Sequence, residues 1–275
     1  MNGCSDMQPI RSCPNCGSTS FKVKYVEPPF KVVKCIACSL VYLGNPPDKN
    51  SIYENYYEGV APNAEDYRND SQVVSLAEIF AINKQRIALV KKAKPLGNLL
   101  DIGCGRGYFM KLARDHGFKV IGIDVSKNAV QYARSAFGLP VTVKTLDELR
   151  AASEAYDVIT LWHVLEHFID PFEELQKIGA LLAEEGVCFI EVPNLYSLKF
   201  MLSRSKWGGG NHPLYHRTFF SDKTLKRTLL ESGFSTVSRL KVSYQLPGRN
   251  AAYVALKRAL NEIALDAFLD YAAWK

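Results

Sequence analysis

The stretch that decides the fold is LLDIGCGRGYF, from Leu99 to Phe109. It begins with a short apolar run, which is typical of a buried strand, and a turn dense in glycine follows at once. This order predicts a strand that passes through a glycine loop into a helix. Glycines allow a positive φ and a close approach to a ligand, and the free N–H groups of the following helix point at whatever binds. A nucleotide-like cofactor is the expected occupant, and a plain glycine turn is the alternative.

Two carboxylates are predicted to lie beside this loop. Asp101 ends the first strand and would be costly to bury without a partner, so we expect it to face the loop or a charged ligand. A helix from Tyr108 to Asp115 leads to a second buried strand that ends in Asp124. This acid lies about 20 residues beyond the glycines, the spacing at which a carboxylate accepts hydrogen bonds from a ribose. The loop and the two strand ends would form one pocket.

The same residues resemble the class I S-adenosylmethionine-dependent methyltransferases. LLDIGCGRG is similar to their first motif and VIGIDVS to their second. The resemblance implies that the loop lines the methionine side of the cofactor, that Asp124 holds the ribose hydroxyls and that Asp147 contacts the adenine. The full set of cofactor-binding residues that it implies is Asp101, Gly103, Cys104, Gly105, Gly107, Asp124, Val125, Leu146, Asp147 and Trp162. A dehydrogenase fits less well, because the loop is GxGxG rather than GxGxxG and follows an aspartate.

A second polar motif, WHVLEHFIDP, follows the predicted fourth strand. Ligands of doubly wound sheets lie outside the carboxyl ends of the strands, so its polar groups are expected to face the pocket. The motif is similar to the LEHV.DP signature of small-molecule methyltransferases, including quinone-pathway O-methyltransferases and sugar C-methyltransferases. Glu166 and His167 could hold the loop in place, His167 or His163 could act as general base, or the group could bind a divalent metal. His163 replaces the first glutamate of the Glu-x-x-Glu-His motif of some relatives, which weakens the metal interpretation.

Four of the seven cysteines, Cys13, Cys16, Cys35 and Cys38, form a C-x2-C…C-x2-C pattern spaced as in a zinc ribbon. The chain between the two pairs alternates as in a hairpin. A structural zinc ion would stabilise a segment whose own core is small. Reduced surface cysteines or two disulfides are the alternative, which a cytosolic chain disfavours.

The predicted fold class is α/β: a doubly wound, mainly parallel, Rossmann-like sheet with flanking helices, plus the small zinc ribbon. Residues 1–44 form the ribbon, residues 45–95 a linker with a tyrosine-rich lid and a leading helix from Asn69 to Lys94, and residues 96–275 the methyltransferase domain. The tyrosine-rich stretch could equally pack the ribbon against the main domain.

Two regions near the C-terminus are less regular. An insertion at about 195–220 places glycines beside aromatic and basic residues, which predicts a substrate-gating loop or, alternatively, a disordered surface loop. His216 within it resembles part of the family's HLYHFT segment and is a second candidate for contact with the acceptor. Residues 251–274 have helical periodicity, so the seventh, antiparallel strand expected of the family is not predicted.

Composition and charge limit the classes of function that are possible. The net charge of +6 comes from scattered Lys and Arg residues, which permits an anionic substrate such as a nucleotide sugar or RNA without requiring one. No apolar run approaches the roughly 20 residues that span a bilayer, and the N-terminus lacks a signal-peptide core, so a cytoplasmic location without a membrane partner is expected.

The predicted function is methyl transfer from S-adenosylmethionine to a small acceptor, such as a sugar nucleotide, a phenol or a quinone-type metabolite, by in-line displacement. The alternative is a ribbon that binds RNA or protein, with a methyltransferase domain that modifies that macromolecule or only senses the cofactor. Nucleic acid is possible but not favoured, since the ribbon holds few arginines.

Overall fold

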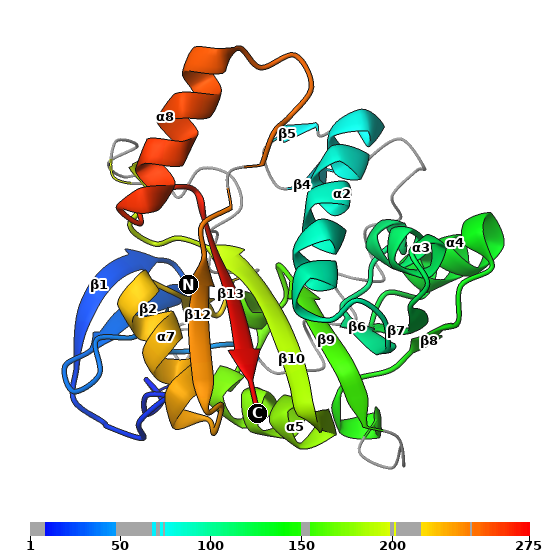
Figure 1. Cartoon of the computed structure of the whole chain (residues 1–275). Coiled ribbons are helices and arrows are strands. Elements are labelled where there is room, and N and C mark those ends of the chain that lie inside the picture. Colours follow the sequence, from blue (N-terminus) through cyan, green and yellow to red (C-terminus); the bar gives the residue numbers. More distant parts are fainter. Residues whose placement is uncertain are drawn as a thin grey trace, which may run out of the picture.

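A seven-stranded sheet forms the centre of the computed structural model, which describes residues 9–47, 68–69, 72–73, 75–149, 155–198, 201, 216–242 and 244–275. The strand order is β12-β13-β10-β9-β6-β7-β8 (Figure 1). All strands are parallel except β13, which pairs antiparallel with β10 and β12. The strands are β6 (Asn98–Ile102), β7 (Lys119–Asp124), β8 (Val141–Val143), β9 (Tyr156–Trp162), β10 (Leu182–Pro193), β12 (Thr236–Leu240) and β13 (Phe268–Trp274).

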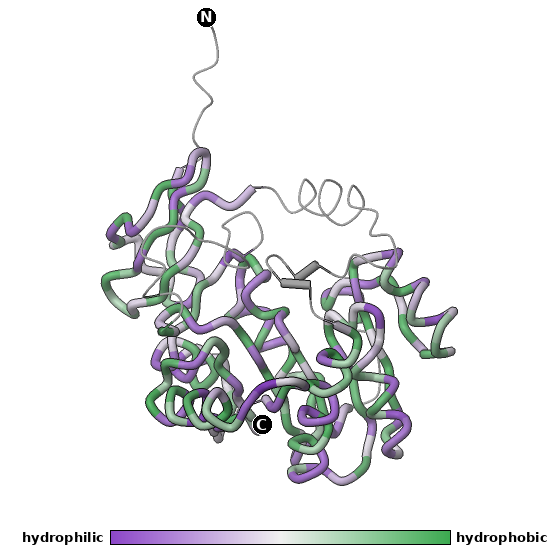
Figure 2. Tube along the Cα trace, turned by 90° about the horizontal axis from the view of Figure 1, so that it is seen from above, coloured by the Kyte–Doolittle hydropathy of each residue, from purple (hydrophilic) through white to green (hydrophobic). Residues whose placement is uncertain are grey.

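Helices cover both faces of this sheet, which confirms the doubly wound α/β fold class. One apolar cluster joins α2 (Leu76–Ala93), α3 (Tyr108–Asp115) and α4 (Lys127–Phe137) to one face. The other joins α5 (Pro171–Leu181) and α7 (Asp222–Glu231) to the opposite face. Side chains alternate between the two clusters along each strand, as Phe189 and Ile190 do in β10. Hydrophilic and hydrophobic residues alternate along the helical coils, as expected for helices with one buried side (Figure 2).

The N-terminal cysteine segment forms a second, smaller sheet with the order β1-β2-β3-β11. Its first strands are β1 (Phe21–Glu27) and β2 (Phe30–Cys35), the hairpin that the alternating pattern predicted, followed by β3 (Val41–Leu43). The fourth strand, β11 (Thr218–Phe219), follows β10 in the chain and pairs antiparallel with β3. The ribbon, here residues 9–44, is therefore joined to the main domain by strand pairing. The division of the chain at residues 44 and 95 stays a prediction.

The leading helix begins later than its apolar pattern indicated. Helix α2 starts at Leu76, after Ser75 and Glu78 form a reciprocal capping box. The prediction of helix from Asn69 is wrong, because Arg68–Asn69 (β4) and Gln72–Val73 (β5) form a short antiparallel pair instead. The capping residues, rather than the apolar pattern, set the start of the helix. The tyrosine-rich stretch at 52–57 lies outside the described residues.

The seventh strand is present, so the prediction of continuous helical structure over residues 251–274 is wrong. Helix α8 (Ala251–Glu262) ends early, and β13 follows between β10 and β12. Residues 269–273 are buried on both faces of the sheet, so this strand lacks the polar alternation by which a half-exposed strand is recognised. Its two alanines also favour helix over strand on propensity alone.

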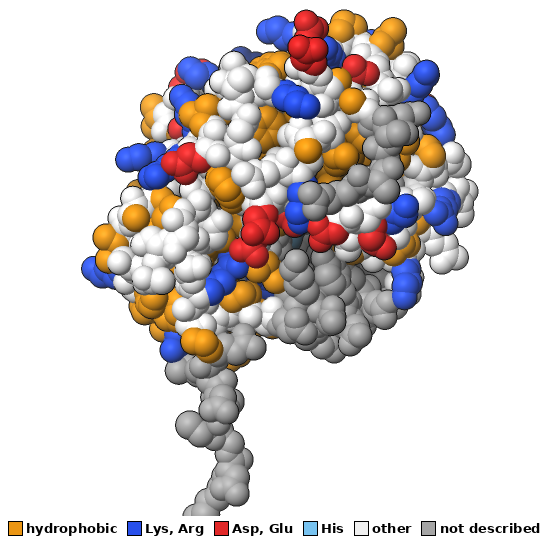
Figure 3. Space-filling view, turned by 90° about the horizontal axis from the view of Figure 1, so that it is seen from below, with side chains coloured by type: hydrophobic (Ala, Val, Ile, Leu, Met, Phe, Trp, Pro, Cys, Tyr) orange, Lys and Arg blue, Asp and Glu red, His pale blue; other side chains and the backbone are white. Residues whose placement is uncertain are grey.

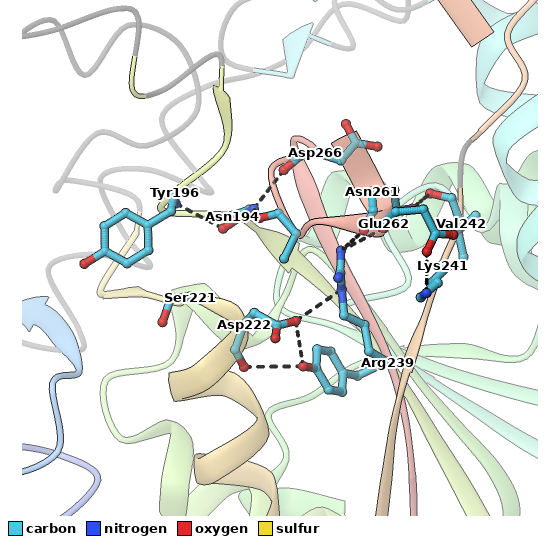
Figure 4. Close-up of polar contacts among 12 residues, drawn as sticks. Asn194, Tyr196, Ser221, Asp222, Arg239, Lys241, Val242, Asn261, Glu262 and Asp266 are labelled. Atoms are coloured by element: carbon cyan, nitrogen blue, oxygen red, sulfur yellow. Dashed lines mark hydrogen bonds and ion pairs between the residues drawn. The ribbon is translucent and has the colours of Figure 1, made fainter. Parts of the chain in front are cut away.

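Polar contacts fix the turn that leads into β13 (Figure 4). The side-chain amide of Asn194 donates to the backbone carbonyls of Ala264 and Asp266 at 2.8 and 2.9 Å. On the neighbouring edge, Arg239 donates to the Asn261 carbonyl at 2.7 Å and pairs with Asp222 at 3.1 Å. These contacts hold the reversed strand at the carboxyl end of β10.

The described surface carries mixed charge. On the face shown in Figure 3, Lys and Arg side chains lie scattered among acidic and apolar ones, as the sequence indicated. Within the described ranges, no helix combines the length and apolarity needed to cross a membrane.

Candidate active site

The glycine loop between β6 and α3 adopts a backbone that few other residues tolerate. Gly103, Gly105 and Gly107 have φ values of +67°, +52° and +77°. A Cβ added to Gly103 would lie 2.5 Å from Cγ2 of Val164, in the turn after β9. One added to Gly107 would lie 2.5 Å from Cδ1 of Leu139. The loop is thus packed directly against the WHVLEH turn, and this contact requires glycine.

Asp124, at the carboxyl end of β7, ties the loop to the next helix. Its carboxylate accepts hydrogen bonds from the backbone N–H groups of Gly105 and Ser126, both at 2.8 Å. Ser126 caps α4 by accepting from the N–H of Ala129. Burial raises the pKa of Asp124 and the backbone hydrogen bonds counteract that rise. Cys104 is buried and Val125 is partly exposed beside these residues.

Asp101 lies deeper, at the carboxyl end of β6, with 2% of its surface exposed. Its Oδ1 accepts a hydrogen bond of 2.6 Å from the Thr160 hydroxyl on β9. Burial raises the pKa of Asp101 to about 7, against the opposing effects of Thr160 and the charge of Arg86. The carboxyl group therefore titrates near neutral pH.

Three more residues predicted to bind the cofactor, Leu146, Asp147 and Trp162, lie further from the loop in sequence. In the structure they pack against, or pair with, other side chains. Leu146 is buried, and Asp147 pairs with Lys177 of α5 at 2.6 Å. Trp162 packs edge-on against Phe109 of α3, with ring centroids 5.2 Å apart. The structure brings the glycine loop, Asp101 and Asp124 together; contact of these residues, and of Asp147 and Trp162, with the cofactor stays a proposal.

A buried polar cluster that sequence reasoning missed surrounds Glu191 of β10. Its carboxylate pairs with Nη2 of Arg86 at 2.6 Å and with Nε2 of His163 at 2.7 Å, and it accepts from the Tyr244 hydroxyl. The same hydroxyl lies 3.0 Å from Oδ1 of Asp270. The available signal was one acid in each of two otherwise apolar strands, FIEVP and FLDYAAW, because a lone buried acid needs a partner.

His163 is held in an unusual conformation by this cluster. It has a φ of +59°, which is rare outside glycine and typical of functional sites. Burial lowers the pKa of His163, but the charges of Glu191 and Glu166 outweigh it and raise the pKa to about 9. At neutral pH the ring is therefore a cation between two carboxylates, and it cannot accept a proton.

Glu166, His167 and His216 form a second cluster beside the first. One ligand atom from each lies within 4.8 Å of the others, and the two histidine rings stand edge to face at 4.9 Å. Glu166 is 1% exposed, and neither of its oxygens has a hydrogen-bond partner among the described residues, although Nδ1 of His163 lies 3.5 Å away. One carboxylate and two imidazoles can either transfer a proton or bind a divalent cation.

Within this second cluster, Glu166 is charged and His216 is neutral at neutral pH. Burial tends to raise the pKa of Glu166, but the neighbouring histidines hold it below its ordinary value, so the carboxylate is ionised. Burial lowers the pKa of His216 to about 3, which keeps that ring neutral. A narrow pocket adjoins the cluster and is lined by Glu166, Pro193, Leu195, His216, Thr218 and Phe219. Residues 199–200 and 202–215 of the predicted insertion lie outside the described part of the chain.

The four ribbon cysteines converge as predicted. Their sulfur atoms all lie within 4.8 Å of one another, with Cys13–Cys38 and Cys16–Cys35 at 3.5 Å. Tetrahedral zinc with bonds of about 2.3 Å places its sulfur ligands about 3.8 Å apart. The set therefore fits one structural zinc ion, which would be held by four thiolates with no open position.

Comparison with known proteins identifies the family. Residues 76–239 match the family described as a methyltransferase domain, and this match covers more than half of the chain. The chain belongs to that family. The fold and recognition predicted from the glycine loop, a class I S-adenosylmethionine-dependent methyltransferase, are thereby confirmed.

Individual relatives agree with this methyltransferase assignment. The chain is 32% identical over 114 residues to a protein named ubiquinone biosynthesis O-methyltransferase from Haemophilus ducreyi, over 38% of this chain and 48% of that protein. The chain thus spans about half the length of this curated relative.

Two solved structures share the fold. An S-adenosylmethionine-dependent methyltransferase from Archaeoglobus fulgidus has a TM-score of 0.54 and 21% identity, over 83% of this chain and 100% of that one. A plantazolicin methyltransferase in complex with S-adenosylhomocysteine has a TM-score of 0.51 and 18% identity, over 83% and 90%.

We propose that Asp101 contacts S-adenosylmethionine, and its raised pKa then makes cofactor binding depend on pH. The cofactor carries a positive sulfonium and an ammonium, so it binds more tightly when Asp101 is ionised. With a pKa of about 7, the acid is increasingly protonated below neutrality, and binding must then release that proton. Calorimetry should show the Kd of S-adenosylmethionine rising by up to about tenfold for each pH unit below that pKa. Asp101→Asn should bind weakly at every pH; a wild-type Kd that stays flat between about pH 8 and about pH 5 would remove Asp101 from the cofactor site.

Proposed function

We propose that this chain transfers the methyl group of S-adenosylmethionine to an oxygen of a small hydroxylated acceptor, with a phenol of a quinone-type metabolite as the leading class. The contact between Gly103 and Val164 carries the proposal, because it sets the cofactor loop against the turn that bears the histidines. Donor and acceptor sites would then adjoin, as in-line displacement requires. The names of the curated relatives favour the quinone-type acceptor.

In this proposal the chain binds and aligns the cofactor, which supplies the electrophilic methyl group. The glycine loop and Asp101 hold its methionine part, Asp124 holds the ribose, and Leu146 with Asp147 flanks the adenine. The buried surroundings of Asp101 and Glu191 exclude water from the donor side. The ribbon cysteines hold zinc as a structural ion.

His167 is the proposed general base. His163 is already protonated at neutral pH, and the low pKa of His216 makes that ring a poor proton acceptor. His167, partly exposed beside the buried Glu166 carboxylate, is the remaining imidazole of the cluster. It would take the acceptor proton while Glu166 stabilises the imidazolium that forms.

The test is the pH–rate profile of His167→Ala. We expect kcat to fall by about a hundredfold near neutral pH and to recover partly at high pH, where a phenol ionises unaided. The Kd of S-adenosylmethionine should not change. His116→Ala, an exposed histidine at the end of α3, is the matched control and should keep wild-type kcat. Turnover of His167→Ala that stays intact at all pH values would defeat the base assignment, and a strict requirement for added Mg²⁺ or Mn²⁺ would assign the cluster to a metal instead.

A further inference from the structure

We propose that the ribbon positions the acceptor site, and that Arg11 is the positioning residue through which it fixes the Glu166–His167–His216 cluster. The proposal rests on the function proposed above, because it assumes that this cluster meets the acceptor. It assigns the ribbon a role in the reaction that is distinct from stabilising its own fold.

Arg11 makes the first connection. Its guanidinium donates to Oδ1 of Asp170 at 2.9 Å and to the carbonyl of Ile169 at 2.5 Å, just after His167 in the chain. Asp170 is the N-cap residue of α5, yet its side chain makes no capping bond. The backbone N–H of Arg11 donates to Gly44 within the ribbon at 2.8 Å. The backbone of Arg11 is thus bonded within the ribbon, and its side chain is bonded to the turn that follows His167.

Strand pairing makes the second connection. The N–H of Leu43 in β3 donates to the carbonyl of Arg217, and the N–H of Arg217 donates to the carbonyl of Glu166, both at 2.8 Å. Thr218 then pairs with Tyr42 across β11 and β3. A continuous line of backbone hydrogen bonds therefore runs from the ribbon to Glu166. It passes through the residue that follows His216.

Packing makes both connections rigid. Tyr42 is fully buried, and its hydroxyl donates to the Arg11 carbonyl at 3.2 Å. Leu40 and Tyr42 belong to the same apolar cluster as Leu165 and Phe220, which flank Glu166 and β11. Movement of the ribbon would therefore shift the histidine cluster, because close-packed cores transmit displacement.

The cofactor side has polar contacts of its own. Asp124 fixes the glycine loop through bonds to Gly105 and Ser126, and Asp101 is bonded to Thr160. All of these residues belong to the central sheet and its connections. Removing the contacts of Arg11 should therefore lower kcat/KM for the acceptor while leaving the Kd of S-adenosylmethionine unchanged.

The experiment compares Arg11→Gln with Asn15→Ala. Asn15 also joins the ribbon to the main domain, but its amide donates to Glu231 on α7 at 2.8 Å, away from the histidines. We expect Arg11→Gln to lower kcat/KM for the acceptor by about tenfold, mostly through a higher KM, with the Kd of S-adenosylmethionine unchanged within about twofold. Arg11→Lys should recover part of the loss, since an ammonium can keep one of the two contacts. Asn15→Ala should match the wild type.

Hydrogen exchange supplies a readout that needs no acceptor. Peptides covering residues 164–172 and 216–220 should exchange faster in Arg11→Gln than in Asn15→Ala, while the glycine loop stays protected. Unchanged exchange in those peptides would overturn the proposal, and so would equal loosening of the glycine loop with loss of cofactor affinity. If exchange changes as expected but the wild type methylates no acceptor, the proposed function fails and the link from the ribbon to the cluster stands.

Discussion

Gly103→Ala should weaken binding of S-adenosylmethionine by about a hundredfold or more, which corresponds to about 2.7 kcal/mol. The new Cβ would sit 2.5 Å from Val164, a distance that real Cβ atoms do not show. The φ of +67° would add a penalty of about 1 kcal/mol for any residue with a Cβ. The loop must therefore move away from the turn after β9, and its backbone can no longer face the cofactor. Titration calorimetry with S-adenosylmethionine and S-adenosylhomocysteine measures the effect.

Gly138→Ala is the matched control for this substitution. Gly138 ends α4 with a similar φ of +59°, but an added Cβ there would meet nothing within 4 Å. It should cost about 1 kcal/mol of stability through backbone strain and leave cofactor affinity unchanged. Equal affinities in Gly103→Ala and Gly138→Ala would show that the cofactor does not depend on the close contact between the loop and Val164.

Cys35→Ser should cause the largest loss of stability. Cys35 is fully buried, its sulfur accepts the N–H of Cys38 at 3.4 Å, and it belongs to the core cluster that the ribbon shares with the main domain. In the structural-zinc proposal, losing one of four thiolates would release the ion, and zinc binding contributes about 10 kcal/mol or more to folding of isolated zinc fingers. We expect the purified variant to hold less than about one zinc per chain and the Tm to fall by about 10 °C or more.

Cys188→Ala controls for loss of a buried thiol. Cys188 is equally buried in β10 but lies apart from the four-cysteine cluster. It should lower stability by about 1 kcal/mol through a small cavity and keep the zinc content of the wild type. A wild-type protein that holds no zinc, and whose Tm does not respond to a strong chelator, would refute the structural-zinc proposal.

Features with local causes could be predicted from sequence. The glycine loop and helix α3 from Tyr108 to Asp115 occur where predicted, because each depends on residues close together in the chain. The cysteine spacing likewise predicted the convergence of four sulfur atoms. The residue types and their spacing directly indicate where a positive φ is needed, where a helix is capped and where a metal could bind.

Features created by tertiary contact could not be predicted in this way. The strand character of β13 depends on burial between β10 and β12, which its own residues do not reveal. The bonds of Arg86 and Tyr244 to Glu191 join residues far apart in the chain, and no spacing rule links them. The pairing of β3 with β11 similarly joins segments that are far apart in the chain. Roles that depend on such contacts, including the protonation of His163, required the structure.

A crystal structure of the protein with bound S-adenosylhomocysteine tests the central claim most directly. We predict that the ribose hydroxyls meet the Asp124 carboxylate, that the homocysteine part lies over Gly103 and Gly105 beside Asp101, and that the sulfur points toward His167. A ligand bound elsewhere, or a crevice closed at saturating ligand, would contradict the account.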